Sequence, residues 1–261
     1  MAPRVMTVSG PIPPEKLGFT LPHEHTAISL WHIANRWDYW ELTPDDDLMI
    51  EELRDFRRRG GSTLVDLTPP GVGRDPDRLR RLASASNINI VMGTGWYREA
   101  YYPAEARIDR RTVDDLAAEI VREVEHGVGE SGIRPGIIGE IGTDKPWVSA
   151  LEERVHRAAA RAAKRTGLAL TTHGVQSAVG IEEALEPRLV ETIVELLERG
   201  FGEQLLLSQD VCHNAQLKAN GGFGYVYLQQ HFLPTLRTAA VGEGEIRQMT
   251  IENPARILTI P

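Results

Sequence analysis

The sequence has a single cysteine, Cys212, among its 261 residues. One thiol cannot form an intramolecular disulfide, so the composition gives no sign of an oxidising compartment and we expect a cytoplasmic protein. The sequence also has no apolar run that approaches the roughly 18 residues of a membrane span. Its first ten residues lack the apolar core of a signal peptide. We therefore expect neither secretion nor a membrane partner.

Positive charge is also scarce. The chain carries 29 Lys and Arg residues against 37 Asp and Glu residues, a formal net charge of −8. This balance repels phosphate backbones, so we expect no nucleic acid partner and favour a small uncharged ligand. With 41% hydrophobic and 25% charged residues, the chain can bury a large core. No low-complexity tract or linker divides it, which predicts one domain over residues 1–261.

From Leu17 onward, short apolar runs alternate with longer stretches of helical period. This pattern is typical of βα units that build a parallel sheet or barrel. We predict strands at Leu17–His25, Ser62–Leu67, Ile88–Gly93, Gly136–Ile141, Leu168–His173 and Gln204–Asp210. We predict helices at Asp45–Arg59, Asp75–Ser86, Thr112–His126, Ser149–Arg165 and Pro187–Arg199. Six strands are fewer than the eight of a closed (β/α)8 barrel, so we expect an α/β fold with fewer strands than a complete barrel.

Some of the predicted helices have clear end signals. Glu152 follows Ser149 by three residues, which is the spacing of a capping box. Gly167 stands where a C-terminal glycine belongs. Pro187 is expected at the first position of the last predicted helix, where a missing amide hydrogen costs nothing.

Metal-ligand types gather at the carboxyl ends of the predicted strands. His23 and His25 end the first strand, and residues i and i+2 of a strand point to one face, so both imidazoles converge while Glu24 points away. Glu140, His173 and Asp210 end three further strands, and active sites of (β/α)8 barrels are built at that edge. Each residue alone is better explained as a satisfied buried polar group. The set of five predicts a divalent metal site, with zinc the best match for imidazole ligands.

At these positions the sequence resembles the phosphotriesterase family of the amidohydrolase superfamily. The resemblance spans nearly the whole chain. It rests on the segments GFTLPHEH (18–25), VDLTPPGVGRD (65–75), GTGWY (93–97), GIIGEIG (136–142), TTHG (171–174), LLSQDVCH (206–213) and ENPARIL (252–258). It implies a TIM-like (β/α)8 barrel of the amidohydrolase type that carries two divalent metals bridged by a carboxylate and a hydroxide.

The resemblance also implies residue roles. Glu140 takes the place of the bridging carboxylate. His23, His25 and Asp210 complete one metal site, and His173 belongs to the other. Asp210 is also the expected proton acceptor, and Tyr97 resembles the tyrosine that lactone-hydrolysing members direct at the hydroxide.

The chain departs from the family after His173. A further histidine ligand of the type Ile-Gly-His-x-Asp is expected there, and nothing like it lies between Gly174 and Ser208. A block of about two βα units, on the order of 60 residues, is missing by comparison with a full barrel. One tight metal site and one weak site are therefore expected. The exposed sheet edges predict either a homodimer that covers the gap or a mobile loop from Gly174 to Leu189.

Aromatic residues follow several predicted strand ends and predict an apolar pocket over the metal. They are Trp31, Trp37, Trp40, Trp96, Trp147, Tyr39, Tyr97, Tyr101, Tyr102, Tyr225 and Tyr227. No cluster of Lys or Arg surrounds the motifs, which disfavours a phosphate monoester. The leading hypothesis is a metal-dependent hydrolase of a lactone, carboxyl ester or phosphotriester. The alternative is a catalytically impaired binding protein that retains one metal site.

Overall fold

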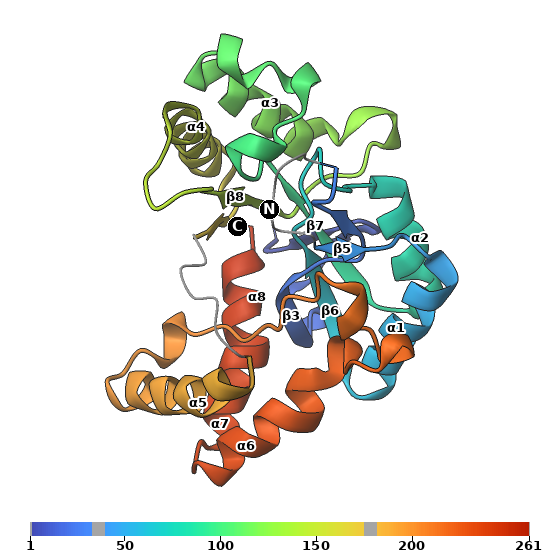
Figure 1. Cartoon of the computed structure of the whole chain (residues 1–261), viewed down its shortest axis with the longest axis vertical. Coiled ribbons are helices and arrows are strands. Elements are labelled where there is room, and N and C mark those ends of the chain that lie inside the picture. Colours follow the sequence, from blue (N-terminus) through green and yellow to red (C-terminus); the bar gives the residue numbers. More distant parts are fainter. Residues whose placement is uncertain (1, 33–39, 175–181, 261) are drawn as a thin grey trace.

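The computed structural model describes residues 2–32, 40–174 and 182–260. Its centre is a curved, five-stranded parallel sheet in the order β3-β6-β7-β8-β9 (Figure 1). The strands are β3 (Phe19–Glu24), β6 (Gly61–Asp66), β7 (Asn89–Thr94), β8 (Ile137–Gly142) and β9 (Leu170–His173). Sequence order and spatial order coincide, so each strand lies beside the next along one arc. The fold is that of an incomplete (β/α)8 barrel, as the sequence predicted.

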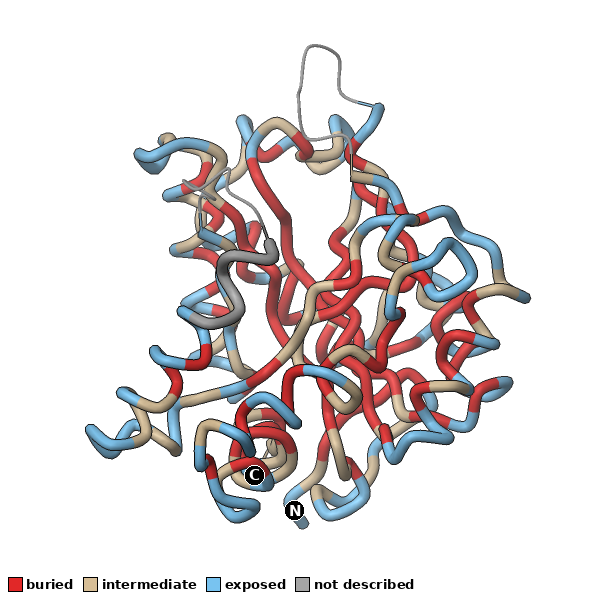
Figure 2. The backbone as a smooth tube through the Cα atoms, turned by 60° about the horizontal axis from the view of Figure 1, so that its bottom comes forward, coloured by how far each residue is buried: buried red, intermediate tan, exposed pale blue. Residues whose placement is uncertain are grey.

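A helix follows each of the first four strands and returns the chain to the start of the next. These helices are α1 (Asp46–Arg58), α2 (Pro76–Ser86), α3 (Val113–His126) and α4 (Ala150–Thr166). Their apolar faces cover the outside of the sheet, and buried residues fill the centre of the molecule in Figure 2. For example, Leu116 of α3 and Val155 of α4 share one buried cluster with Ile138 of β8. Five parallel strands thus present their carboxyl ends along one rim.

The observed helix ends agree with the capping signals. Ser149 and Glu152 form both hydrogen bonds of a capping box, and Gly167 ends α4 with a φ of +74°. Asp45 and Asp75 cap α1 and α2 from the preceding position. The prediction for Pro187 is wrong, because α5 (Glu182–Glu198) begins five residues earlier.

The predicted strand Gln204–Asp210 is not a strand in the structure. A short 3-10 turn, Gly202–Gln204, comes first, and residues 205–210 carry no assigned strand. The segment still lies beside β3, held mainly by side chains: the Ser208 hydroxyl accepts a hydrogen bond from the His23 amide at 3.0 Å. Because side chains make these bonds, there is no regular backbone ladder. The sheet therefore has five assigned strands among the described residues.

The C-terminal region is helical. It contains α6 (Leu233–Thr238), α7 (Glu243–Arg247) and α8 (Asn253–Leu258), and the turn Gln248–Glu252 contacts β3. Two small antiparallel pairs complete the described fold: β1 (Val5–Thr7) with β2 (Gly10–Ile12), and β4 (Ile28–Ser29) with β5 (Glu41–Leu42). Residues 175–181 of the predicted loop from Gly174 to Leu189 lie outside the described residues, and the prediction is wrong for residues 182–189, which belong to α5. The homodimer and the single domain stay predictions.

Among the described residues, no helix is long and apolar enough to cross a membrane.

Candidate metal centre

The end of β3 and the residue after it supply two imidazoles to the site. His23 and His25 face the carboxylate of Glu140, which stands at the end of β8: His23 Nε2 lies 3.4 Å from Glu140 Oε2, and His25 Nε2 lies 3.5 Å from Glu140 Oε1. Asp210 completes the group from the C-terminal segment, with Oδ1 at 3.4 Å from His25 Nε2 and 3.8 Å from His23 Nε2. The structure brings together the four residues that the sequence assigned to one metal.

The spacing of these atoms fits one metal ion. A tetrahedral ion with ligand bonds of about 2.0–2.2 Å separates its ligand atoms by about 3.3–3.6 Å. Ligand atoms of His23, His25 and Glu140 all lie within 4.8 Å of one another, and the imidazole–carboxylate separations of 3.4–3.5 Å fall in this range. Asp210 Oδ1 stands beside this group of three, 3.4 Å from His25 Nε2 and 3.8 Å from His23 Nε2. Two of the atoms, His23 Nε2 and Asp210 Oδ1, are buried without a hydrogen-bond partner. Buried polar atoms are rarely left so, and an ion between them would satisfy both. The residues present therefore fit a divalent cation.

The ring of His25 is oriented by Thr68. Its Nδ1 lies 2.9 Å from Thr68 Oγ1, and this hydroxyl gives its own hydrogen to the carbonyl of Ala27. The hydroxyl must therefore accept from Nδ1–H, so Nε2 is directed at the site and offers a lone pair there once the ring is neutral. Such an outer partner is the usual means of holding a ligating histidine. The Tyr225 hydroxyl supports the same turn by donating to the His25 carbonyl at 2.5 Å.

Asp66 holds the chain immediately after His25. This carboxylate, at the end of β6, accepts hydrogen bonds from the amide and the hydroxyl of Thr26 at 2.9 and 2.8 Å. Arg78 of α2 donates to the Thr26 carbonyl at 3.1 Å. Sequence reasoning gave no role to Asp66, although its place at a strand end in VDLT was the available signal.

Glu140 reaches the site because Gly139 precedes it. Gly139 has a φ of +128°, and a Cβ at this position would lie 2.5 Å from the carbonyl oxygen of Thr171 on β9. Only glycine permits this close approach of β8 and β9. Burial raises the pKa of Glu140, but the hydrogen bond from His173 and the nearby imidazoles of His23 and His25 outweigh it, and the net pKa is well below the usual range. Glu140 is thus a carboxylate, as a metal ligand must be.

Asp210 occupies a constrained turn. Its φ is +51°, a conformation that non-glycine residues rarely adopt. The buried carboxylate of Glu24 clamps this turn, accepting from the amides of Gln209 and Val211 at 3.1 and 2.7 Å and from the Ser208 hydroxyl at 2.7 Å. The prediction that Glu24 points away from the imidazoles is confirmed. Sequence reasoning missed its partner, because the two segments lie almost 190 residues apart.

Burial is the main influence on the pKa of the carboxylate and imidazole groups, but charge reverses its effect. Burial lowers the pKa of His25. The contact with Asp210 and the charges of Glu140 and Asp210 outweigh burial and raise the pKa to about 9. The pKa of Asp210 is lowered in turn, because its interactions with His25 and His23 outweigh its burial. Without a metal ion, His25 is therefore an imidazolium beside the carboxylates of Glu140 and Asp210 at neutral pH. A cation would compete with the imidazole proton.

His173, at the end of β9, has different surroundings. Its Nδ1 lies 2.6 Å from Glu140 Oε2, so the structure brings it to the same carboxylate. Its Nε2 lies 2.9 Å from the Arg98 guanidinium and 3.4 Å from the Tyr97 hydroxyl. Sequence reasoning did not identify Arg98, since a lone arginine after a strand carries no metal signal.

Tyr97 is buried beside His173, in the loop that follows β7. Burial and the charge of Glu140 raise its pKa far above the usual value. The hydroxyl therefore stays protonated and acts as a hydrogen-bonding group, not as a phenolate. The expectation that Tyr97 lies at the site is met by its position. Its direction toward a hydroxide stays a prediction.

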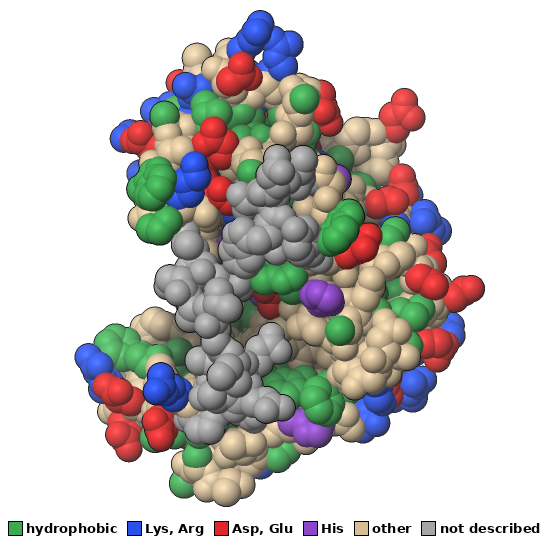
Figure 3. Space-filling model, in the orientation of Figure 1, with side chains coloured by type: hydrophobic (Ala, Val, Ile, Leu, Met, Phe, Trp, Pro, Cys, Tyr) green, Lys and Arg blue, Asp and Glu red, His purple; other side chains and the backbone are tan. Residues whose placement is uncertain are grey.

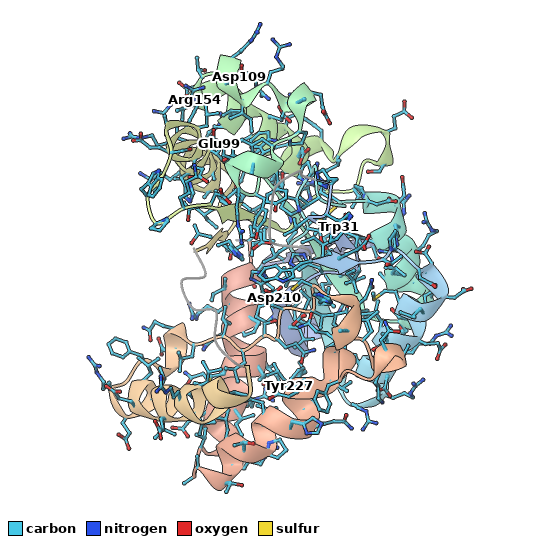
Figure 4. The ribbon with its side chains drawn as sticks, in the orientation of Figure 1. Trp31, Glu99, Asp109, Arg154, Asp210 and Tyr227 are labelled. Carbon is cyan, nitrogen blue, oxygen red and sulfur yellow. The ribbon has the colours of Figure 1, made fainter. Side chains whose placement is uncertain are left out.

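The other aromatic residues do not gather as one wall. Trp96 packs into the cluster under α3 and α4, and Tyr225 is fully buried beneath His25. Trp31 and Trp147 are 61% and 63% exposed. Trp37 and Tyr39 lie outside the described residues. Asp210 lies near the centre of the molecule in Figure 4, with Trp31 above it in that view. On the face drawn in Figure 3, charged side chains lie mainly around the margin.

Comparison with known proteins gives the same answer at the level of family. A model of the phosphotriesterase family matches residues 3–186 and 182–258. The phosphotriesterase homology protein of Mycobacterium tuberculosis is 29% identical over 98% of this chain and 97% of its own length. An N-acetyltaurine hydrolase of Dictyostelium discoideum is 27% identical over 82% of this chain and 73% of its own.

A solved structure shares the fold. The crystal structure of the Escherichia coli phosphotriesterase homology protein, complexed with phosphate in its active site, has a TM-score of 0.84 and 28% identity. The match covers 93% of this chain and 99% of the E. coli chain. These likenesses support a hydrolase at the level of the family. Because the family model accounts for nearly all of the sequence from residue 3 to residue 258, the chain belongs to the phosphotriesterase family.

Proposed function

We propose that the protein is a metal-dependent hydrolase that acts on a neutral lactone, carboxyl ester or phosphotriester. One observation carries the proposal: ligand atoms of His23, His25 and Glu140 lie within 4.8 Å of one another, with Asp210 Oδ1 3.4 Å from His25 Nε2. Two atoms of this centre, His23 Nε2 and Asp210 Oδ1, are buried without a hydrogen-bond partner. Imidazole and carboxylate ligands favour zinc among divalent ions. We also infer a cytoplasmic location from the single cysteine.

His23, His25, Glu140 and Asp210 would hold the ion. A divalent ion there supplies Lewis acidity and makes hydroxide available at neutral pH. Asp210 is the most exposed of the four, with 37% of its side chain accessible, so it faces incoming water and substrate. Its lowered pKa keeps it ionised at neutral pH, ready to accept the proton of the attacking hydroxide. Tyr97 would donate a hydrogen bond beside the reacting group.

The pairing of the nearby arginines favours an uncharged substrate. Arg74 binds Glu123 through two hydrogen bonds, Arg78 binds Asp46, and Arg98 contacts His173. Each of these cations already has a protein partner, so a doubly charged phosphate monoester would meet little compensating charge. This supports an uncharged substrate.

The comparison with relatives supports a shortened barrel as the setting of this site. The alignment to the M. tuberculosis protein runs over 323 positions, although this chain has 261 residues. The two family matches meet at residues 182–186, where the sequence predicted missing βα units. We propose that this region, between β9 and α5, is where the chain is shorter than a full barrel.

The test is metal reconstitution followed by a substrate panel. The purified protein is stripped of metal, reloaded with one equivalent of Zn²⁺, and assayed with a lactone, a carboxyl ester, a phosphotriester and an N-acyl amide. Hydrolysis that depends on the metal supports the proposal, and the substrate preference defines the class. If the loaded protein binds Zn²⁺ but hydrolyses none of them, the proposal fails and the binding-protein alternative is favoured.

A further inference from the structure

The two nitrogens of the His173 ring make contacts of opposite kinds. Nδ1 faces a carboxylate oxygen of Glu140 at 2.6 Å, and Nε2 faces the guanidinium of Arg98 at 2.9 Å. A carboxylate can only accept a hydrogen bond, whereas a guanidinium can only donate one. Both contacts are satisfied together in only one form of the neutral ring, with the proton on Nδ1 and the lone pair on Nε2.

We propose that Arg98 is a positioning residue that holds His173 as the Nδ1–H tautomer, so that the centre binds one divalent ion and not two. A metal ligand needs a lone pair directed at the ion. In this tautomer, His173 presents a proton to Glu140 instead. The second metal that the family resemblance implies therefore has no ligand from His173, and Glu140 serves a single ion.

The position of Arg98 is built into the fold. Its side chain is 6% exposed, and its guanidinium carbon lies 4.7 Å from the centre of the Tyr97 ring, a cation–π contact. Gly142, at the end of β8, leaves the space through which it passes: a Cβ there would lie 2.8 Å from Arg98 Cγ. The Gly142 amide also donates to the Tyr97 carbonyl at 3.1 Å, which fixes the loop that carries both residues.

The hydrogen-bond chain also explains what His173 does. Arg98 donates to His173, and His173 donates to Glu140 Oε2, so the chain fixes the orientation of this carboxylate. Its other oxygen, Oε1, is then directed at His25. Charge-assisted bonds of this kind are about twice as strong as neutral ones. His173 thereby orients a ligand of the first metal and does not bind a second.

The inference deepens the proposed function, since it concerns the same centre, but its test does not depend on turnover. The whole chain is labelled with ¹⁵N-histidine, and long-range ¹H–¹⁵N spectra are recorded without metal and with one and two equivalents of Zn²⁺. A His173→Gln sample assigns the His173 signals among those of the eight histidines. We expect a protonated Nδ1 and an unprotonated Nε2 at every Zn²⁺ level.

Three variants separate the contributions. Arg98→Met removes the donor but keeps an apolar stem, so the Nε2–H tautomer should become populated and Nδ1 should respond to the second equivalent of Zn²⁺. Arg98→Lys keeps a cationic donor and should retain Nδ1–H. Tyr97→Phe removes the other hydroxyl near Nε2 and should also retain it, because Arg98 is the closer donor. Circular dichroism checks that each variant is folded.

Several results would overturn the proposal. They are an Nε2–H tautomer in the unaltered protein, an Nδ1 that loses its proton on the second equivalent of Zn²⁺, or an Arg98→Met variant whose His173 signals are unchanged. A hydrolase with an Nε2–H His173 would refute this inference and leave the proposed function standing. A protein with the expected tautomer and no hydrolysis would refute the proposed function and leave this inference standing.

Discussion

His25 and His173 face the same carboxylate, Glu140, from the two edge strands of the sheet, yet they present opposite groups to it. Thr68 accepts from Nδ1–H of His25, so Nε2 points into the site and offers a lone pair there once the ring is neutral. Arg98 donates to Nε2 of His173, so a proton points into the site. The same residue type at matching strand ends can thus be a ligand or an orienting donor. The group behind the ring decides which.

The largest expected effect tests the His25 side of this comparison. His25→Ala removes one of four converging ligands, so the metal affinity should fall by more than the ~10–100-fold typical of losing an outer-shell partner. Metal analysis after dialysis should show loss of the bound ion, and hydrolysis assays should show loss of activity. His126→Ala, at an exposed position on α3, is the matched control and should change neither. Retention of one equivalent of metal by His25→Ala would contradict the site.

Asp210→Asn should have the next largest effect. The amide keeps the shape of the side chain but loses its charge and its ability to accept a proton, so the rate should fall by about 10²–10⁴-fold. The fall should be in kcat more than in KM, because the proton transfer occurs in the transition state. Steady-state kinetics on the best substrate measures the split. An effect confined to KM would show that Asp210 only binds substrate.

Metal binding should strengthen as pH rises. In the metal-free protein the pKa of His25 is about 9, above its unfolded value of 6.5, so near pH 7 the ring must release a proton to bind the ion. One released proton corresponds to about a tenfold gain in affinity per pH unit below pH 9. Calorimetric titrations in buffers of different ionisation enthalpy measure the proton. Affinity that is independent of pH from 6 to 8 would exclude an imidazolium at this position.

The raised pKa of His25 should make the metal-free protein less stable as pH rises, whereas metal binding becomes stronger. A folded pKa above the unfolded one stabilises the fold fully below about pH 6.5, and this contribution is lost as pH rises through about 9. Asp210, whose folded pKa is lowered, contributes stability above its unfolded pKa and loses it as pH falls. Denaturant titrations without metal should therefore show declining stability from pH 6.5 to 9.

His173→Gln tests the other side of the comparison. If His173 only orients Glu140, the variant should still bind one equivalent of Zn²⁺, with an affinity lowered by no more than about 10–100-fold. Equilibrium dialysis beside His25→Ala makes the contrast direct. Equal loss of metal in the two variants would show that His173 is a ligand like His25.

Tyr97→Phe should have the smallest effect on the metal. It removes one hydroxyl and no ligand, so the metal content should stay at one equivalent while the rate of lactone or ester hydrolysis falls by about 10–100-fold, as for other outer-shell changes. Metal analysis and kinetics on the same sample separate the two. An unchanged rate would remove Tyr97 from the reaction.

The chemistry of the strand ends was predictable because it depends on local periodicity. His23 and His25 share a face through the two-residue repeat of a strand, and Glu140 and His173 follow apolar runs of strand length. The segment 205–210 was mistaken for part of a sixth strand, because its run of leucines has the composition of one. Its Ser208 hydroxyl bonds to the His23 backbone and the Glu24 carboxylate, and no local pattern shows that choice.

The sequence by itself determined the parallel βα order, the helix caps at Ser149 and Gly167, and the five residues that meet at the rim. These features follow from short-range geometry and residue chemistry. Only the tertiary structure decided that Glu24 clamps the turn of Asp210 and that Arg98 stands behind His173. Each contact joins segments many residues apart, and the direction of a hydrogen bond depends on which atoms packing brings together.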